Sequence, residues 1–447
     1  MSKKILIGLI VTVVIAVGVV AVFSLRKEKP IEVLPPGEKP VKAEEVGYGW
    51  SVKDTAREAI EEAVSMMKEK LGGKNPKYVL LWYTIAYDPA EIKNTLRELL
   101  GADVQIQGVS SAVGVMTPDG YHVGKVGSLA ILGIASDKVD IGVGGVNLEE
   151  MTPREAGRKA IEEAISNSGK EGKPQFVYIT ATPGQEEEIL LGIEDVIGQD
   201  VPIIGGSAGD ETLSGKYSNI ANDEVYKKGV VLAALYTELE IGRSHEFGYM
   251  KSVEKGVVTK AKGRILYEID GRAAAEVYNE WTGGHFDKEL KEGGMILAEA
   301  TFYPIAKIVK GEKGENYLCV SHPGVINLPE KSITMFTDIE EGDEIMLLHG
   351  NWQWLINRAQ STARKAMRNA NISSGEGLFA FYTFCAGTLL AIPESERAKV
   401  PHLLRGEIGD IPFVGGFTLG EQVFMPGVGN RHANLVNSLA IFKKPGK

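Results

Sequence analysis

The sequence predicts an α/β fold of mixed sheets flanked by helices, arranged as two lobes and preceded by one transmembrane helix. Three observations lead to this prediction. Helical and strand periodicities alternate from Ser51 onward, one α-β-α-β-loop-β unit recurs three times, and an apolar segment opens the chain. A length of 447 residues allows two or three domains, and 24% charged residues is ordinary for a globular protein.

The first 25 residues predict a membrane anchor. Residues 5–25 carry no charge, and a helix of that length spans a bilayer core. The apolar stretch is long and lacks a small-residue cleavage site, which favours an uncleaved anchor over a cleaved signal peptide. Lysines and arginines flank both ends, so the preference for a soluble domain outside the cytoplasm rests on the usual behaviour of N-terminal anchors. Residues 26–47 contain four prolines and predict an extended tether.

The first copy of the repeated unit follows the tether. A helix over 54–71 places Ala, Ile, Val and Met on one face, and the apolar and aromatic run 78–84 is typical of a buried strand. The remaining elements are a helix over 89–100, a strand over 104–107, a loop over 108–111 and a closing strand over 127–134.

The same order returns twice. The second copy has a helix beginning at Thr152 with capping-box spacing to Glu155. It continues with a strand at 176–182, a helix at 186–197, a strand at 201–204, a loop at 205–210 and a strand at 229–235. The third has a helix at 355–370, strands at 378–384 and 411–414, a loop at 415–421 and a strand at 435–442. Residues 201–206 (VPIIGG) and 411–416 (IPFVGG) match position by position, which indicates a real repeat.

Residues 257–348 follow a different plan. They predict strands at 257–269, a helix at 271–281 and a β-rich remainder, without a recognisable glycine loop of a fourth unit. We therefore expect an N-terminal domain over 48–270 and a C-terminal domain over 271–447.

Charge and cysteine content narrow the function classes. The formal net charge is −10, and an acidic surface repels phosphate backbones, so no nucleic-acid partner is expected. Cys319 and Cys385 are too few for a disulfide framework or a zinc cluster, and whether they pair stays open. The seven histidines are dispersed without metal spacing, and we expect neither a metal nor a cofactor.

The glycine loops are the candidate binding elements. Gly205–Asp210 combines tolerance for unusual φ with exposed N–H groups and small side chains, which lets a ligand approach the backbone. It is neither a Walker A sequence nor a G-x-G-x-x-G turn. Open α/β sheets bind ligands at strand ends, but a tight strand exit that merely needs glycine explains each loop equally well.

Two further features carry candidate chemistry. Cys385 aligns with Thr182 and Thr84 at the end of the first strand, and would be a nucleophile only with a neighbouring histidine such as His349, His402 or His432. A buried small side chain is the favoured interpretation. Asp210 and Glu421 fall one position apart after their loops, where they could pair with a ligand ammonium or remain solvated. The predicted ligand-binding residues are Ser110, Ser111, Gly205, Gly206, Ser207, Asp210, Cys385, Gly415, Gly416 and Glu421.

These segments resemble the FIST family of sensory domains. The N-terminal family region resembles residues 78–269 through its motif stretches 201–210 and 263–274. Residues 271–442 resemble the C-terminal region of the family. The motifs that carry this resemblance are residues 339–345, Cys385-Ala386-Gly387, residues 415–421 and the terminal His432, Asn434 and Leu439. One departure is Thr388, where the family often has Arg. If that Arg contacts an anionic ligand, the ligand preference of this chain could differ.

The resemblance implies a sensor of small molecules such as amino acids. We therefore expect a membrane-anchored, non-catalytic sensory domain that binds a small polar, amino-acid-like ligand in signal transduction. Because no output segment follows Phe442, a signalling partner protein is also expected. The alternatives are a hydrolase-type enzyme using Cys385 or the loop carboxylates, and a protein-docking module whose glycine loops are architectural.

Overall fold

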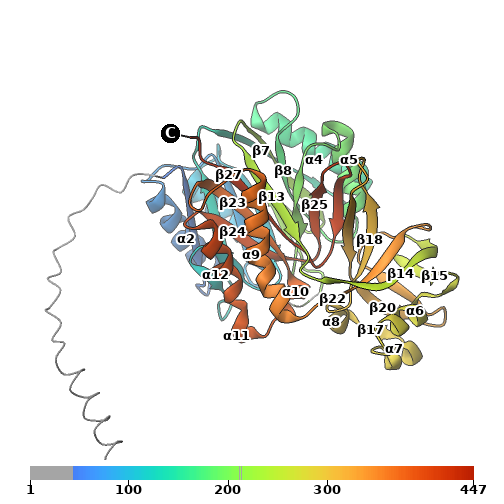
Figure 1. Cartoon of the computed structure of the whole chain (residues 1–447). Helices are drawn as coiled ribbons and strands as arrows, with labels where there is room; N and C mark the ends of the chain where they lie inside the picture. The colour runs from blue at the N-terminus through green and yellow to red at the C-terminus, as the bar shows by residue number, and fades with distance from the viewer. Residues whose placement is uncertain (1–43, 211, 213, 447) are drawn as a thin grey trace, which may run out of the picture. The chain divides into compact units, whose positions relative to one another are not determined.

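Three six-stranded mixed sheets, one for each sequence repeat, form the body of the structure, and a nine-stranded sheet adjoins them (Figure 1). The computed structural model describes residues 44–446 apart from 211 and 213. The predicted membrane anchor and nearly all of the tether lie outside the described residues. None of the helices within 44–446 is long and apolar enough to cross a membrane.

Each unit has an outer strand, a helix, a strand, a second helical segment, a strand, a hairpin and a closing strand. Unit 1 consists of β1 (Val46–Ser51), α2 (Ala56–Lys70), β2 (Tyr78–Thr84), α3 (Pro89–Leu100), β3 (Gln105–Ser111), β4 (Val115–Thr117), β5 (Gly120–His122) and β6 (Leu129–Ile134). Unit 2 consists of β7 (Val139–Asn147), α4 (Pro153–Ser168), β8 (Phe176–Ala181), α5 (Glu186–Ile197), β9 (Ile203–Ser207), β10 (Asn219–Ala221), β11 (Glu224–Tyr226) and β12 (Gly229–Thr237). Unit 3 consists of β13 (Ile241–Glu246), α9 (Trp352–Asn369), β23 (Gly377–Cys385), α10 (Ala386–Leu390), α11 (Glu394–Arg397), α12 (Lys399–Ile408), β24 (Phe413–Thr418), β25 (Glu421–Met425), β26 (Gly429–Ala433) and β27 (Asn437–Lys443).

Local chemistry explains where these elements begin. Thr152 and Glu155 form the capping box predicted for α4, and Pro153 fills its first turn. Strands β2 and β23 are buried along their whole length, as their continuous apolar sequence predicts.

The predicted α/β class with mixed sheets flanked by helices is confirmed. Missing from the sequence prediction are the outer strands β1, β7 and β13 and the hairpin after each glycine segment. Because β1 begins at Val46, the sheet also starts inside the predicted tether.

The three units exchange their hairpins. Within each unit the two central strands are parallel, as in β2 and β3, and the closing strand is antiparallel to the first of them. The hairpin strand that follows then pairs with a neighbouring unit: β4 with β24, β10 with β3, and β25 with β9. The predicted two lobes are therefore not separate, because each six-stranded sheet contains strands from two units.

A shared aromatic core lies between the sheets. It includes Tyr78 of unit 1, Tyr178 of unit 2 and Phe381 of unit 3, all fully buried. The ring centroids of Tyr178 and Phe381 are 4.6 Å apart. Full burial of a phenylalanine such as Phe381 stabilises the fold by roughly 1.5–3 kcal/mol, so the units stabilise one another.

Residues 250–349 form an insertion in unit 3 between β13 and α9, called here the insertion sheet. Its elements are β14 (Met250–Lys262), β15 (Ile265–Ile269), β16 (Arg272–Ala273), α6 (Ala274–Trp281), α7 (Asp287–Glu292), β17 (Gly294–Met295), α8 (Leu297–Ala300), β18 (Ile305–Lys310), β19 (Asn316–Ser321), β20 (Pro323–Asn327), β21 (Ser332–Met335) and β22 (Glu344–His349). It has its own apolar core beneath α6. The predicted β-rich segment with a different plan is confirmed.

Candidate functional site

The carboxyl ends of β3, β9 and β24 meet at one place, called here the strand-end junction. Three backbone hydrogen bonds connect the units in a cycle. The amide of Gly209 donates to Ser110 O (2.9 Å), the amide of Leu419 donates to Ser207 O (3.1 Å), and the amide of Ala112 donates to the carbonyl oxygen of Phe417 (2.9 Å). The structure thus brings the three predicted glycine segments together.

All ten predicted ligand-binding residues are buried. The glycine pairs 205–206 and 415–416, predicted as loops, lie inside β9 and β24, and none of them has a left-handed φ. The loop prediction is wrong for a packing reason. A Cβ on Gly205 would overlap the carbonyl oxygen of Ile179, and one on Gly416 would overlap the ring of Trp82. Glycine is needed here for close approach of strands.

The serines connect the strand ends. Ser111 Oγ donates to Gly114 O (2.6 Å) and accepts from the amide of Phe417 (2.9 Å). Ser110 Oγ accepts from the amide of Ser218 (3.2 Å). These two hydroxyls therefore hold neighbouring chain segments.

Asp210 organises the loop that follows β9. Its carboxylate accepts hydrogen bonds from the amides of Thr212 (2.8 Å), Ser214 (3.0 Å), Gly215 (2.8 Å) and Lys216 (3.1 Å). Burial raises its pKa, but these hydrogen bonds outweigh burial and lower the pKa below the ordinary range. Asp210 is thus an ionised carboxylate satisfied by its own loop.

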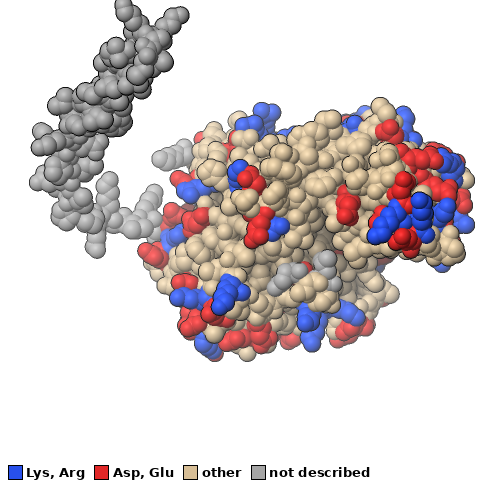
Figure 2. All heavy atoms as spheres, turned by 90° about the horizontal axis from the view of Figure 1, so that it is seen from below, with Lys and Arg blue, Asp and Glu red and all other residues tan. Residues whose placement is uncertain are grey.

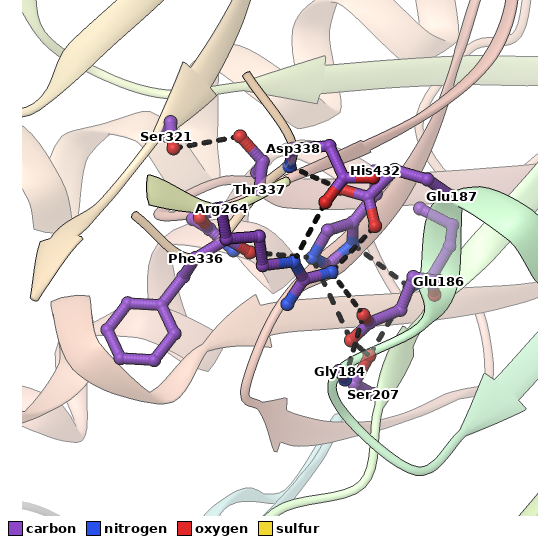
Figure 3. Close-up of polar contacts among 12 residues, drawn as sticks. Gly184, Glu186, Glu187, Ser207, Arg264, Ser321, Phe336, Thr337, Asp338 and His432 are labelled. Atoms are coloured by element: carbon purple, nitrogen blue, oxygen red, sulfur yellow. Dashed lines mark hydrogen bonds and ion pairs between the residues drawn. The ribbon is translucent and has the colours of Figure 1, made fainter. Parts of the chain in front are cut away.

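A cluster of charged side chains adjoins the junction where the insertion sheet meets units 2 and 3 (Figure 3). Arg264 Nη2 donates to Glu186 Oε2 (2.7 Å) and to Glu187 Oε2 (2.6 Å), and its Nε lies 3.4 Å from Asp338 Oδ1. The arginine comes from the turn before β15, and both glutamates come from the first turn of α5. We call Glu186, Glu187, Arg264, Asp338 and His432 the arginine cluster.

Glu186 connects the arginine cluster to the junction. Its Oε1 accepts a hydrogen bond from Ser207 Oγ (2.6 Å) and lies 3.7 Å from His432 Nε2. Burial raises the pKa of Glu186, but His432, Arg264 and the hydrogen bonds outweigh burial and lower it to about 2. Glu186 is therefore a buried, permanently ionised carboxylate at neutral pH.

The outer edge of the arginine cluster reaches solvent. Side-chain exposure is 1% for Glu186, 19% for Arg264, 23% for Glu187 and 44% for Asp338. One guanidinium and two carboxylates are therefore partly accessible above a buried anion. The pKa of Asp338 is raised by burial and by Glu187, although Arg264 opposes this.

Cys385 and Glu421 lie together on the other side of the junction. Glu421 accepts hydrogen bonds from Thr418 Oγ1 (2.6 Å) and from the amide of Val436 (3.0 Å). Thr388, at the position where the family often has Arg, accepts a hydrogen bond from the buried Arg358 of α9. A guanidinium from another helix therefore lies beside the cysteine segment.

Cys385 lacks the features of a nucleophile. Burial and the nearby Glu421 raise the pKa of its thiol to about 12. Among the described residues, no hydrogen bond connects it to His349, His402 or His432. Cys319 and Cys385 are both free thiols, which answers the question of pairing for this structure.

We expect both thiols to resist modification in the folded chain. Treatment with an aromatic disulfide reagent at pH 8 should leave Cys319 and Cys385 unmodified, because both are buried and protonated. Both should react at once in guanidinium chloride. Rapid labelling of Cys385 in the folded chain would contradict this assignment and revive the nucleophile interpretation.

Glu421 should make stability depend on pH. Burial raises its pKa to about 7, despite the hydrogen bonds and Arg358. The pKa of Glu421 is higher in the folded chain than in the unfolded chain. The contribution of Glu421 to the free energy of unfolding is therefore complete below pH 4.5 and is lost as pH rises through 7. Glu421→Gln should reduce the loss of unfolding free energy between pH 5 and 8 by about 2–3 kcal/mol. Urea titrations at several pH values measure this, and parallel profiles for both proteins would contradict it.

The described cavities lie away from the junction. A groove of about 890 Å³ lies at the opposite ends of the strands, near Gln175, Tyr236 and Lys443. Among the described residues, no group of three His, Cys, Asp or Glu side chains is placed to hold a metal ion. On the face shown in Figure 2, acidic and basic side chains are interspersed.

These features define a repeat-built α/β protein with a charged cluster at its shared strand ends. Residues 77–272 match the FIST N domain and residues 274–423 match the FIST C domain, so the chain belongs to the FIST family. FIST domains are sensory-type domains in signalling.

The chain is also similar to a curated protein and to a solved structure. Uncharacterized protein MJ1623 of Methanocaldococcus jannaschii is 28% identical over 197 residues, which are 43% of this chain and 37% of that protein. The chain thus spans little more than a third of that relative. A cyanuric acid hydrolase from A. caulinodans aligns over 90% of this chain and 99% of its own, at 9% identity and a TM-score of 0.37. That likeness is too distant to inform function.

Sequence reasoning missed most of the arginine cluster. Arg264 lies in a stretch that carried the family resemblance, and Glu186 and Glu187 begin a predicted helix, but no spacing linked them. Only His432 had been singled out, as a possible partner of Cys385.

Proposed function

We propose that this chain is a membrane-anchored sensory domain that binds a small polar, amino-acid-like ligand without turning it over. The observation that carries the proposal is the partly exposed edge of the arginine cluster beside the strand-end junction. Residues 5–25 supply the anchor, which places the soluble part outside the cytoplasm. A partner protein receives the signal.

The charges of this edge complement a zwitterion. Arg264 contacts its three carboxylates through Nε and Nη2, and among the described residues no hydrogen bond involves its Nη1, which can donate to a ligand carboxylate. Asp338 presents a carboxylate that can bind an ammonium group. The raised pKa of Asp338 supports this role, because its negative charge is only partly compensated and would gain from a nearby cation.

The position of the cluster is suited to signalling. It contains side chains from unit 2, unit 3 and the insertion sheet, and Ser207 connects it to the cycle of hydrogen bonds between units. A ligand that changed these contacts would alter how the insertion sheet packs on the body. The protonated Cys385 and the self-satisfied Asp210 support a non-catalytic role.

Thermal shift on the full-length chain in detergent tests the proposal. We expect one or more free amino acids to raise the melting temperature, because binding to the folded state alone stabilises it. Asp338→Asn should raise the ligand concentration needed for the same shift at least tenfold. This corresponds to a loss of about 1.4 kcal/mol of binding free energy for each factor of ten. The matched control is Asp137→Asn, an exposed aspartate paired with Lys77, which should respond like the wild type.

Two outcomes would refute the proposal. One is the absence of any response across the amino acids and related metabolites. The other is conversion of a stabilising compound to product, detected by NMR, which would assign an enzyme instead.

A further inference from the structure

A second cavity lies at the seam between units 2 and 3, away from the arginine cluster. It has a volume of about 360 Å³, and its walls come from β13, β25, β19 and α9. We call it the seam groove. Its volume lies within the range of small-molecule sites. Its lining combines the cations Arg243, Lys251 and Lys365 with the aromatic rings of Phe424 and Tyr317.

Arg243 faces inward at the edge of its sheet. Side chains alternate along β13, and a Cβ on Gly242 would meet the carbonyl oxygen of Ala366 in α9. Gly242 therefore faces the covering helix, and Arg243 and His245 face the other way, into the seam. The guanidinium carbon of Arg243 lies 5.3 Å from the centroid of the Phe424 ring.

This arginine lacks an anionic partner. Within the described part of the chain, no carboxylate lies within 4.0 Å of Arg243 and its side chain donates no hydrogen bond. Burial lowers its pKa, and no neighbouring charge contributes. A half-buried cation without a partner is costly, so the site is suited to an anion from outside. By contrast, Arg264 at the other site binds three carboxylates.

The charged side chains that line the seam groove are positive in excess. Lys251 and Lys365 also line it, and the single acidic lining residue, Glu246, is already paired with Lys365. Burial lowers the pKa of His245 to about 4, with Lys365 acting in the same direction, so His245 is neutral at pH 7. The groove thus has an excess of positive charge in a chain whose formal net charge is −10.

We propose that the seam groove binds a small organic anion, a carboxylate or phosphate attached to a flat apolar group. Arg243 and Lys251 hold the anionic group, and Phe424 covers the flat part. Both anion types share this chemistry, since a guanidinium binds either in a bidentate manner. The site is separate from the arginine cluster and does not depend on the ligand proposed there.

Calorimetry on the full-length chain with benzoate, phenyl phosphate and inorganic phosphate tests this inference. At least one aromatic anion should bind saturably, and inorganic phosphate should bind more weakly. Whichever of benzoate and phenyl phosphate binds more tightly identifies the preferred anionic group as a carboxylate or a phosphate. Arg243→Gln should weaken that binding roughly 10- to 100-fold. The control Lys228→Gln, an exposed lysine paired with Glu149, and the variant Asp338→Asn should both bind as the wild type does.

Several results would overturn the inference. These are no saturable binding of either aromatic anion below about 10 mM, unchanged binding by Arg243→Gln, or tighter binding of inorganic phosphate than of both aromatic anions. If Arg243→Gln fails to fold by circular dichroism, the exposed Lys251→Gln replaces it, with a smaller but measurable loss expected. Wild-type affinity in Lys251→Gln would then count against the site.

Discussion

Replacing Arg264 by Met should lower the free energy of unfolding at pH 7 by about 3–5 kcal/mol, because it removes the guanidinium that pairs with a buried carboxylate. Glu186 is 1% exposed, and its Oε2 accepts a hydrogen bond from Arg264 Nη2 at 2.7 Å. Methionine fills similar volume but cannot donate a hydrogen bond. Glu187 and Asp338 lose the same partner, although both are more exposed.

The loss should depend on pH in a defined direction. The pKa of Glu186 falls from its ordinary 4.5 to about 2 in the folded chain. A lowered folded pKa contributes stability above pH 4.5 that disappears as pH falls towards 2, and this amounts to about 3 kcal/mol for such a shift. Removing Arg264 takes away part of that contribution, while His432 and the hydrogen bond from Ser207 retain the rest. The difference between wild type and variant should therefore shrink between pH 5 and 3.

Arg272→Met is the matched control. Arg272 pairs with Glu280 on the surface, and both side chains are at least half exposed, so its replacement should leave stability within experimental error. Urea denaturation followed by circular dichroism measures both variants. Equal losses, or a loss from Arg264→Met that stays constant down to pH 3, would show that the arginine cluster is not electrostatically coupled as described.

The regular elements could be predicted because their signals are local. The run 78–84 and the capping box of Thr152 and Glu155 each specify one strand or one helix start within a few residues. The repeat then placed equivalent strands in units 2 and 3. The hairpin exchange was not predictable, because the short strands β4, β10 and β25 pair with strands of other units, and no local pattern identifies the partner.

The candidate site was predicted only in part. The glycine segments do meet, as their recurrence suggested, but their glycines serve strand packing rather than an open loop. The arginine cluster is assembled from positions 186, 264, 338 and 432, which lie in four separate segments of the chain. Arg264 and Asp338 reach Glu186 only because the insertion sheet folds back on α5. Their opposite charges meet only in the folded structure, and no regular spacing in the sequence indicates that they do.

Replacing Gly205 by Ala should destabilise the chain by about 3 kcal/mol or more, although it adds a single methyl group. Gly205 lies in β9 directly against β8, and the new Cβ would overlap the carbonyl oxygen of Ile179. A backbone atom in the middle of a buried parallel pair cannot move without disturbing its hydrogen bonds. The strands would have to separate, and the bond from the amide of Leu419 to Ser207 O would weaken with them.

Gly406→Ala makes the same chemical change with the opposite expected sign. Gly406 is exposed in α12, and a Cβ there has no atom within 4 Å, so alanine should stabilise the helix by about 0.5–1 kcal/mol. Thermal unfolding of the two variants separates the packing role of Gly205 from a general effect of removing glycine. If Gly205→Ala were as stable as the wild type, the glycine would not be needed for strand packing.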